Sequence, residues 1–300
     1  MRIVSLVPHA TELLFALGLA DEVIAVTHEC DYPAGALTLP RVTRDALTPG
    51  LSSGEIDAAV RERTQAGQSI YELDEALIRR LAPDLIVTQA LCPVCAVSYR
   101  EVAALAERMP GPPRVIALDP HTLGETLGDV RTLAEATGRR DVGVDLIARS
   151  AARIDRVKLA VRGAQRPRVA AIEWFDPIFV AGHWTPQLIE LAGGEDVLGA
   201  VGEPSETSSW EALAACAPQI VLAMPCGYDA PRARTEALAH APRLRALGAE
   251  RVVAVDAAAY FSRPGPRLLD GLELLAHVLH PDRAPPAPAA GLEVALGAAG

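Results

Sequence analysis

The sequence twice carries the same local pattern, in which an amphipathic helix ends at an Ala-Pro pair and passes directly into a short apolar strand. The first copy runs through Pro83 into Asp-Leu-Ile-Val87, and the second runs through Pro218 into Gln-Ile-Val-Leu222. Other short apolar runs, such as Ile3–Leu6 and Arg168–Ile172, also alternate with helical patterns. This alternation predicts parallel sheets flanked by helices. We therefore expect an α/β fold with two Rossmann-like lobes, each a copy of the other.

Four segments follow from this repeat. We expect an N-terminal α/β lobe over residues 1–120, a linking helical segment over 121–163, a C-terminal α/β lobe over 164–282 and a flexible tail over 283–300. The linking segment has few helix breakers, which predicts a long α-helix that bridges the lobes. The tail turns to Pro, Ala and Gly, a composition typical of frayed ends. Because equivalent loops of both lobes carry a cysteine, we expect the ligand cleft between the lobes.

Charge and hydropathy narrow the classes of function. The formal net charge of −10 and the pI near 5.2 oppose a nucleic-acid partner, which calls for a basic face. No apolar stretch approaches the roughly 20 residues needed for a membrane span. The first strand begins at Arg2, which leaves no room for a signal peptide. We expect a cytoplasmic protein as written, or an extracytoplasmic one if a leader was removed, and a monomer.

Four of the five cysteines fall in three loops that each follow a predicted strand. These loops are His28-Glu-Cys30, Cys92-Pro-Val-Cys95 and Pro225-Cys226-Gly227, and such loops form the ligand sites of α/β proteins. If the loops converge, Cys30, Cys92, Cys95 and Cys226 could hold a zinc ion or an iron–sulfur cluster, with His28 as a fifth candidate. A redox dithiol and buried free thiols are the alternatives.

Other candidate ligand contacts also follow predicted strands. Pro8-His-Ala-Thr11 opens a helix, so His9 or Thr11 could cap it, with nearby N–H groups free for a ligand anion. Tyr260-Phe-Ser-Arg263 could hold an anionic or amide-bearing edge of a ligand. Three of the chain's few aromatic residues share one loop region and could stack on a macrocycle: Trp174, Phe175 and Trp184. The alternatives are helix capping alone for His9 or Thr11, a structural loop for residues 260–263 and core packing for the three aromatic rings.

Four stretches carry a resemblance to a known family. They are Ile3-Val-Ser-Leu-Val-Pro-His-Ala-Thr-Glu-Leu-Leu-Phe-Ala-Leu-Gly18, Leu81-Ala-Pro-Asp-Leu-Ile86, Gln187-Leu-Ile-Glu-Leu-Ala-Gly-Gly194 and Ser209-Trp-Glu-Ala-Leu-Ala-Ala-Cys-Ala-Pro-Gln219. In order and spacing they resemble the helical-backbone class of periplasmic substrate-binding proteins, and within it the cobalamin-binding and iron-siderophore-binding members of ABC importers. The resemblance covers residues 1–282. It implies two lobes bridged by one helix, with little hinge motion and a small-molecule ligand in the cleft.

The resemblance also implies an ABC permease as partner, docked through one surface acid on each lobe. Glu211 matches the C-lobe position, whereas the N-lobe position is Ala76, with Asp74 and Glu75 only nearby. The missing N-lobe acid and the missing leader both argue against this partner. The cleft cysteines are a further departure, because importer members do not generally rely on thiols there.

Motifs of common enzymes are missing from the sequence. It has no Gly-x-Ser-x-Gly elbow, no phosphate-binding Gly-x-x-x-x-Gly-Lys loop and no His-Glu-x-x-His helix. We therefore expect a non-enzymatic binding protein whose ligand is cobalamin, another corrinoid or a related metallo-cofactor. The alternative is a cytosolic metal or iron–sulfur protein that uses the cleft cysteines, or an enzyme derived from the binding fold.

Overall fold

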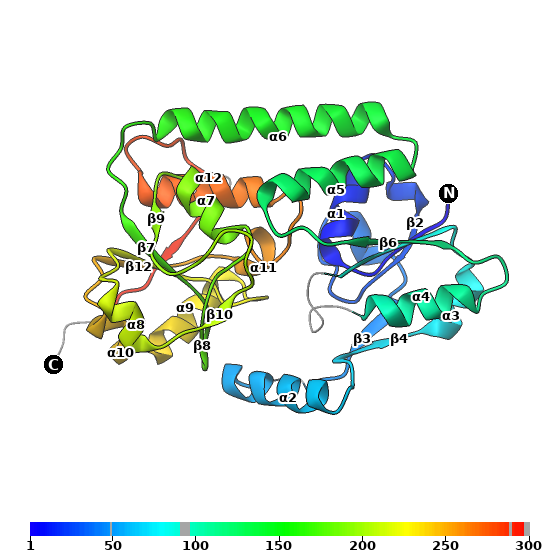
Figure 1. The fold of residues 1–300 in the computed structure, drawn as a ribbon, viewed down its shortest axis with the longest axis horizontal. Helices are drawn as coiled ribbons and strands as arrows, with labels where there is room; N and C mark the ends of the chain where they lie inside the picture. Colours follow the sequence, from blue (N-terminus) through cyan, green and yellow to red (C-terminus); the bar gives the residue numbers. More distant parts are fainter. Residues whose placement is uncertain (49, 91–96, 288–289, 297–300) are drawn as a thin grey trace. The chain divides into compact units, whose positions relative to one another are not determined.

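The computed structural model describes residues 1–300 except 49, 91–96, 288–289 and 297–300. The chain forms two compact units (Figure 1). Unit 1 holds residues 1–120 and 125–147, and unit 2 holds residues 121–124 and 148–300. The chain therefore enters unit 2 briefly at residue 121 before it returns to complete unit 1.

Unit 1 is built on a parallel sheet of four strands in the order β2-β1-β5-β6. Ile3 pairs with both Val23 and Leu85, so β1 lies inside the sheet. A separate antiparallel pair joins β3 to β4. The strands are β1 (Ile3–Ser5), β2 (Val23–Val26), β3 (Thr43–Asp45), β4 (Tyr71–Leu73), β5 (Leu85–Gln89) and β6 (Arg114–Leu118).

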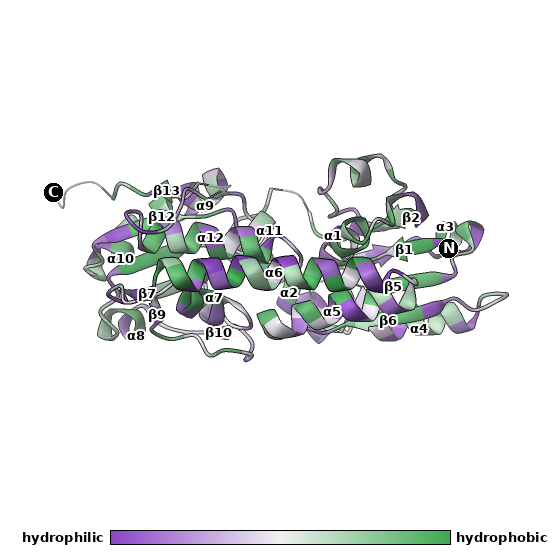
Figure 2. Ribbon diagram, turned by 90° about the horizontal axis from the view of Figure 1, so that it is seen from above, coloured by the Kyte–Doolittle hydropathy of each residue, from purple (hydrophilic) through white to green (hydrophobic). Residues whose placement is uncertain are grey.

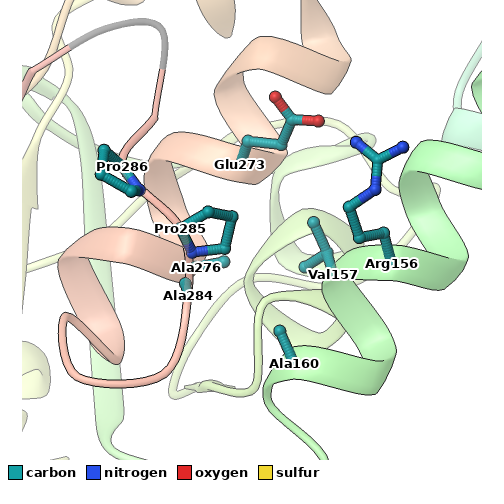
Figure 3. Close-up of a pocket in the computed structure, with 8 residues that line it drawn as sticks. All are labelled: Arg156, Val157, Ala160, Glu273, Ala276, Ala284, Pro285 and Pro286. Atoms are coloured by element: carbon teal, nitrogen blue, oxygen red, sulfur yellow. The ribbon is translucent and has the colours of Figure 1, made fainter.

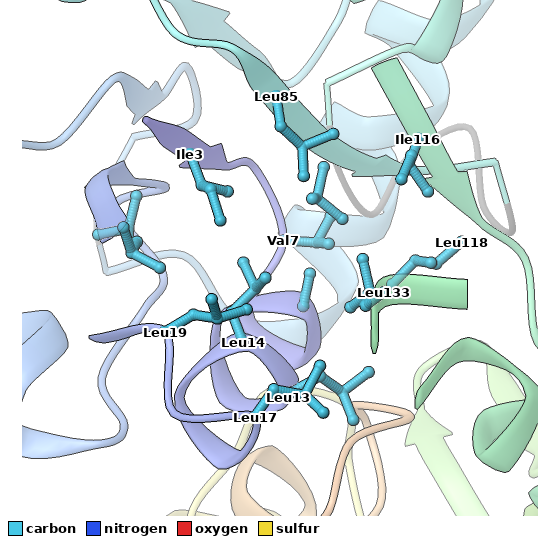
Figure 4. Packing of buried hydrophobic residues seen from close by; sticks show 14 of the residues in the cluster. Ile3, Val7, Leu13, Leu14, Leu17, Leu19, Leu85, Ile116, Leu118 and Leu133 are labelled. Atoms are coloured by element: carbon cyan, nitrogen blue, oxygen red, sulfur yellow. The ribbon is translucent and has the colours of Figure 1, made fainter. Parts of the chain in front are cut away.

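Helices cover both faces of this sheet. One face packs on α1 and α5 through a buried cluster that includes Leu13, Leu14 and Leu133 (Figure 4). The other face packs on α3 and α4 through Ile78 and Leu105. The helices of this part of the chain are α1 (Pro8–Ala16), α2 (Ser53–Gln65), α3 (Glu75–Leu81), α4 (Tyr99–Glu107) and α5 (Leu123–Ala136), with short 3-10 turns at Ala20–Glu22 and Ala34–Thr38.

The long helix α6 (Arg140–Ala160) contributes residues to both units. Hydrophilic and hydrophobic residues alternate along it (Figure 2), as expected for a helix with one buried side. In unit 2, Arg153 of α6 reaches the carboxylates of Asp270, at 2.5 Å, and Glu273, at 2.7 Å. This ion cluster ties α6 to α12 (Leu268–Leu279).

Unit 2 is built on a seven-stranded mixed sheet. Its centre is parallel, with β7 beside β11 and β11 beside β12, while β9 also runs parallel to β7. Three outer strands, β8, β10 and β13, are antiparallel to their neighbours. The strands are β7 (Arg168–Phe175), β8 (Ile178–Val180), β9 (Glu195–Asp196), β10 (Glu206–Thr207), β11 (Ile220–Ala223), β12 (Arg251–Ala254) and β13 (Leu292–Glu293).

One face of the unit 2 sheet packs on three helices through a cluster that includes Leu213, Ala233 and Leu244. On the other face, Gly194 approaches Val169 of the sheet, Ile189 of α7 and Leu279 of α12 closely enough that a side chain would clash. The helices, besides α6 and α12, are α7 (Thr185–Leu191), α8 (Trp210–Ala215), α9 (Ala230–Ala239), α10 (Ala241–Ala246) and α11 (Ala257–Tyr260).

The repeated Ala-Pro step has the same backbone form in both units. Ala82, at φ 41°, ends α3 and leads into β5, and Ala217, at φ 43°, follows α8 and leads into β11. A left-handed residue ends a helix, and the proline after it prevents continuation. The predicted α/β class is confirmed. The repeated sequence pattern corresponds to a repeated structure, in which a helix ends at a left-handed alanine and a strand follows.

Two features differ from the expectations. The unit 2 sheet is mixed, because the chain turns back at residues 176–177 to form β8 beside β7. The tail was expected to be flexible, but Leu292–Glu293 pairs with β12 and Val294 is 5% exposed, so this part of the tail belongs to the sheet and the core. In the described part of the chain, no helix combines the length and hydropathy needed to cross a bilayer.

Candidate functional site

In unit 1 the predicted site residues after β1 lie beneath the surface. Helix α1 begins at Pro8, its N-cap is Val7, and no side chain caps it. His9 is 2% exposed and Thr11 is fully buried. The capping role proposed for His9 or Thr11 is therefore wrong: proline is favoured at the first helical position, which places both residues inside the helix.

Thr11 instead joins a buried polar cluster beside the sheet. Its Oγ1 donates to Ser5 Oγ at 2.8 Å and lies 3.1 Å from the Sγ of Cys30. Cys30 is 1% exposed and packs in the apolar core of unit 1. Such burial favours a structural thiol at this position over a thiol that faces a ligand.

His28 is half-buried at the end of β2. Its Nδ1 lies 2.7 Å from Thr43 Oγ1, which is also 2.7 Å from Thr27 Oγ1. The His28 ring lies 5.5 Å from the Tyr71 ring. Burial lowers the pKa of His28, Arg41 lowers it further, and Asp45 partly opposes both. The imidazole therefore stays neutral at neutral pH, the form that can donate a lone pair to a metal.

The proposed metal ligands are not brought together by the residues that the structure describes. Cys92 and Cys95 lie outside those residues. Cys30 belongs to unit 1 and Cys226 to unit 2. Outside 49, 91–96, 288–289 and 297–300, no three side chains of His, Cys, Asp or Glu are placed to hold a metal ion.

The three predicted macrocycle-stacking rings of unit 2 have different surroundings. Phe175 is 1% exposed and stacks on His240, with ring centroids 5.1 Å apart. Trp184 is 5% exposed, and its Nε1 donates to the Phe261 carbonyl at 2.8 Å. Both rings serve the core, so their prediction as ligand contacts is corrected. Trp174 is only half-buried and keeps part of its surface exposed.

The loops after β11 and β12 hold the other unit 2 candidates. Cys226 is exposed, and the next N–H, of Gly227, donates to Ser262 Oγ at 3.1 Å. Ser262 lies between Tyr260 and Arg263, which are both part-buried. The structure thus brings Cys226 and the 260–263 segment together at the carboxyl ends of adjacent parallel strands, where α/β sheets bind ligands.

Sequence reasoning missed a carboxylate at this end of the sheet. Glu173 lies in β7, its carbonyl accepts the Cys226 N–H at 3.0 Å, and its side chain accepts a hydrogen bond from Ser205. Burial raises the pKa of Glu173, and the Ser205 bond partly opposes that shift. The signal was present, because an acidic residue interrupts the apolar run that follows Arg168 in this strand.

The acid expected to dock a partner, Glu211, is exposed in the first turn of α8, where Ser209 caps the helix. The equivalent helix of unit 1, α3, is capped by Asp74 and begins at Glu75. Glu75 lies 3.3 Å from both Arg79 and Arg108. Two cations therefore share the charge of Glu75. Among the described residues, no ion pair involves Glu211.

A small cavity of about 200 Å³ lies within unit 2 (Figure 3). Apolar residues of α6, α12 and the tail form most of its wall, and Arg156 and Glu273 add charged groups. None of the predicted site residues lines it, and it is too small for a macrocycle. We therefore place the candidate site at the strand ends.

Comparisons with known proteins agree with this architecture. A family model described as periplasmic binding protein matches residues 3–259. The vitamin B12-binding protein of Vibrio cholerae serotype O1 is 27% identical over 286 residues, which cover 91% of this chain and 86% of that protein. The vitamin B12-binding protein of Vibrio vulnificus is 50% identical over 42 residues, 14% of this chain and 15% of that protein.

Solved structures are similar over nearly the whole chain. The periplasmic vitamin B12-binding protein of Vibrio cholerae superposes with a TM-score of 0.67 at 25% identity, covering 93% of this chain and 96% of that one. A periplasmic heme-binding protein of Pseudomonas aeruginosa gives a TM-score of 0.72 at 20% identity, covering 98% of both chains. The second likeness concerns the fold alone.

Proposed function

Since the chain belongs to the periplasmic binding protein family, we propose that it is a substrate-binding protein whose ligand is a corrinoid such as cobalamin. One observation carries the choice of ligand: the similarity to a vitamin B12-binding protein extends over 91% of the chain. Binding, not turnover, is the proposed activity. A related metallo-macrocycle such as haem is the nearest competing ligand, because a protein of similar fold is named for it.

The proposed contacts are described for each unit by itself. In unit 1, His28 offers a neutral imidazole, a donor that cobalt accepts. In unit 2, Trp174 offers part of a flat ring, and Tyr260 and Arg263 offer polar groups at the strand ends. Cys226 is the exposed thiol beside them. This set keeps the predicted residues that are accessible and omits the buried rings of Phe175 and Trp184.

A second candidate function is metal or iron–sulfur binding through the cysteines, in the cytosol or in a derived enzyme. The Cys92-Pro-Val-Cys95 spacing and the exposed thiol of Cys226 support it. The buried position of Cys30 weighs against a four-thiolate set. We keep this function as the alternative that metal analysis must test.

We propose a place of action outside the cytoplasm, by analogy with the relatives named as periplasmic. An ABC permease is the proposed partner, and the exposed Glu211 carboxylate is its proposed contact on unit 2. On unit 1 the ion-paired Glu75 makes a weaker docking group. The proposed oligomeric state is a monomer.

The test is a metal analysis and an absorption spectrum of protein purified without oxygen, repeated after incubation with cobalamin and dialysis. Metal-free protein that retains the corrinoid spectrum at one ligand per chain would support the proposed function. Stoichiometric zinc or iron that is lost in Cys92→Ser, together with no retained corrinoid, would overturn it in favour of the alternative. Cys216→Ser is the matched control, because Cys216 lies at the end of α8 and its Sγ contacts the Val197 carbonyl at 3.7 Å.

A further inference from the structure

The cavity that α6, α12 and the tail enclose in unit 2 has an apolar floor and a charged mouth (Figure 3). Val157, Ala276 and Ala284 line the floor and are 4%, 1% and 7% exposed. Arg156 is exposed and Glu273 is half-buried, and their charged ends lie at the same end of the cavity, which we call the mouth. The cavity therefore offers apolar contact to one part of a ligand and charge to another.

The tail wall of this cavity is fixed to the rest of unit 2. In the turn that follows α12, the N–H groups of Arg283 and Ala284 donate to the His280 carbonyl at 3.0 and 2.9 Å. Arg283 Nη1 also donates to the Arg162 carbonyl, just beyond α6, at 3.3 Å. Because these bonds involve no ligand, the cavity is formed before anything binds, which lowers the cost of binding.

The two charged side chains at the mouth have different surroundings. Arg153 Nε and Nη2 donate to the two carboxylate oxygens of Glu273 at 2.8 and 2.7 Å, and Arg153 also pairs with Asp270 at 2.5 Å. One guanidinium and two carboxylates leave this group with one net negative charge. Arg156 makes no hydrogen bond or ion pair within the part of the chain that the structure describes. The mouth therefore presents one unneutralised charge of each sign.

We propose that this cavity binds an α-amino acid with an apolar side chain, of about the size of leucine. The ligand carboxylate accepts from the Arg156 guanidinium. The ligand ammonium donates to Glu273, whose oxygens can accept further hydrogen bonds beside those from Arg153. A ligand with a single charge would leave the opposite charge at the mouth without a partner, so a zwitterion matches the mouth best.

The volume of the cavity sets the size of the ligand. An apolar cavity of about 150 Å³ holds a benzene molecule, so the 200 Å³ found here admits a slightly larger one. The isobutyl group of leucine is smaller than benzene and leaves room for the α-carbon, which then carries both charged groups toward the mouth. None of the proposed corrinoid contacts lines this cavity, so the inference does not depend on the proposed function.

The experiment titrates the full chain with leucine, 4-methylpentanoate and 3-methylbutylamine by calorimetry. The second compound lacks the ammonium group of leucine, and the third lacks its carboxylate. We expect one leucine per chain with a Kd of about 1 mM or below, and about tenfold weaker binding of each analogue. Absence of leucine binding at about 20 mM would overturn the inference, and so would an analogue that binds as tightly as leucine.

Two variants locate the bound leucine. Arg156→Gln removes the free cation at the mouth, and Ala160→Leu places a larger side chain in the cavity that Ala160 lines. Each should weaken leucine binding about tenfold or more, and wild-type affinity in either variant would overturn the inference. Arg156 is exposed, so its variant should fold even if Ala160→Leu does not. Arg149→Gln, an exposed change elsewhere on α6, is the matched control and should bind leucine as wild type does.

Discussion

Arg2 of unit 1 and Arg168 of unit 2 make the same contact in their respective units. Each arginine directs its Nε and Nη2 groups to the carbonyl at the end of the helix that precedes an Ala-Pro step. In unit 1 the acceptor is Leu81 O, at 2.9 and 2.7 Å, and in unit 2 it is Cys216 O, at 3.1 and 2.7 Å. A cation at a helix C-terminus satisfies a carbonyl that has no partner within the helix and opposes the negative end of the helix dipole.

Replacing Arg168 with Met should therefore destabilise unit 2. The change removes both charge-assisted hydrogen bonds to Cys216 O and a partly exposed ion pair with Glu195. We expect a loss of about 1–2 kcal/mol in the free energy of unfolding, measured by urea denaturation. Arg234→Met, at an exposed position of α9, is the control and should stay within about 0.5 kcal/mol of wild type. Equal stability of the two variants would contradict the role assigned to Arg168.

Asp129 should make the stability of unit 1 depend on pH. Burial raises its pKa to about 7, with help from the charges of Asp119 and Glu125. Its Oδ2 is buried and lacks a hydrogen-bond partner in the described residues. Because the folded protein keeps this proton up to about pH 7 and the unfolded chain loses it near pH 4, stability should fall as pH rises between those values and then level off.

The variant Asp129→Asn should flatten that profile. Asn cannot ionise, so we expect it to be more stable than wild type at pH 8 by about 1–2 kcal/mol and nearly equal to it at pH 4. Urea denaturation at the two pH values measures the difference. If Asp129→Asn kept the same slope of stability against pH as wild type, groups other than Asp129 would cause that slope. Asp145→Asn, an exposed change on α6, is the control.

Phe175→Ala should lower stability and leave intrinsic ligand affinity unchanged. The ring is 1% exposed and packs against the rings of His240 and Trp210, which also pack against each other. Loss of a buried aromatic ring costs about 3–5 kcal/mol. Ligand titration at a temperature where the variant is folded separates the two effects. A variant of normal stability with weakened cobalamin binding would return Phe175 to the ligand site. Leu238→Ala, an exposed apolar change, is the control.

His28→Ala should alter the visible spectrum of bound aquocobalamin. If the imidazole replaces the cobalt-bound water, wild type shifts that spectrum and the variant does not. Because burial lowers the His28 pKa, the imidazole loses its proton at lower pH than an exposed histidine, and the shift should persist below pH 6.5. A free, unshifted spectrum in wild type would exclude His28 as the ligand. His277→Ala, in the last turn of α12, is the control.

The parts of the fold that were predicted from sequence are those with a strong local signal. Pro83 and Pro218 each prevent a helix from continuing, and the apolar run after each proline forms a buried strand. The short strands β9, β10 and β13 have only two residues each, too few for any periodicity to appear. Their positions depend on pairing with distant parts of the chain, which no local pattern reveals.

The sequence indicated which strand-end loops carry candidate residues better than it indicated the surroundings of each residue. The loop that holds Cys226 contacts the 260–263 segment through the Gly227 N–H and Ser262 Oγ, and their role in ligand binding stays a prediction. Thr11 and Phe175 were misassigned because residue type indicates a polar or stacking role but not burial. Glu173 was overlooked because its environment depends on Ser205, 32 positions later in the sequence.

The order in which the two units are completed during synthesis follows from how the chain crosses between them. Helix α5 supplies Val130, Leu133 and other core residues of unit 1, so residues 1–120 alone lack part of their own core. A nascent chain must therefore extend past α5 before unit 1 can close. In unit 2 the outer edge of β12 stays open until Leu292–Glu293 has emerged. Until then an unpaired strand edge is available to other chains, so the pairing of Leu292–Glu293 with β12 protects that edge from association.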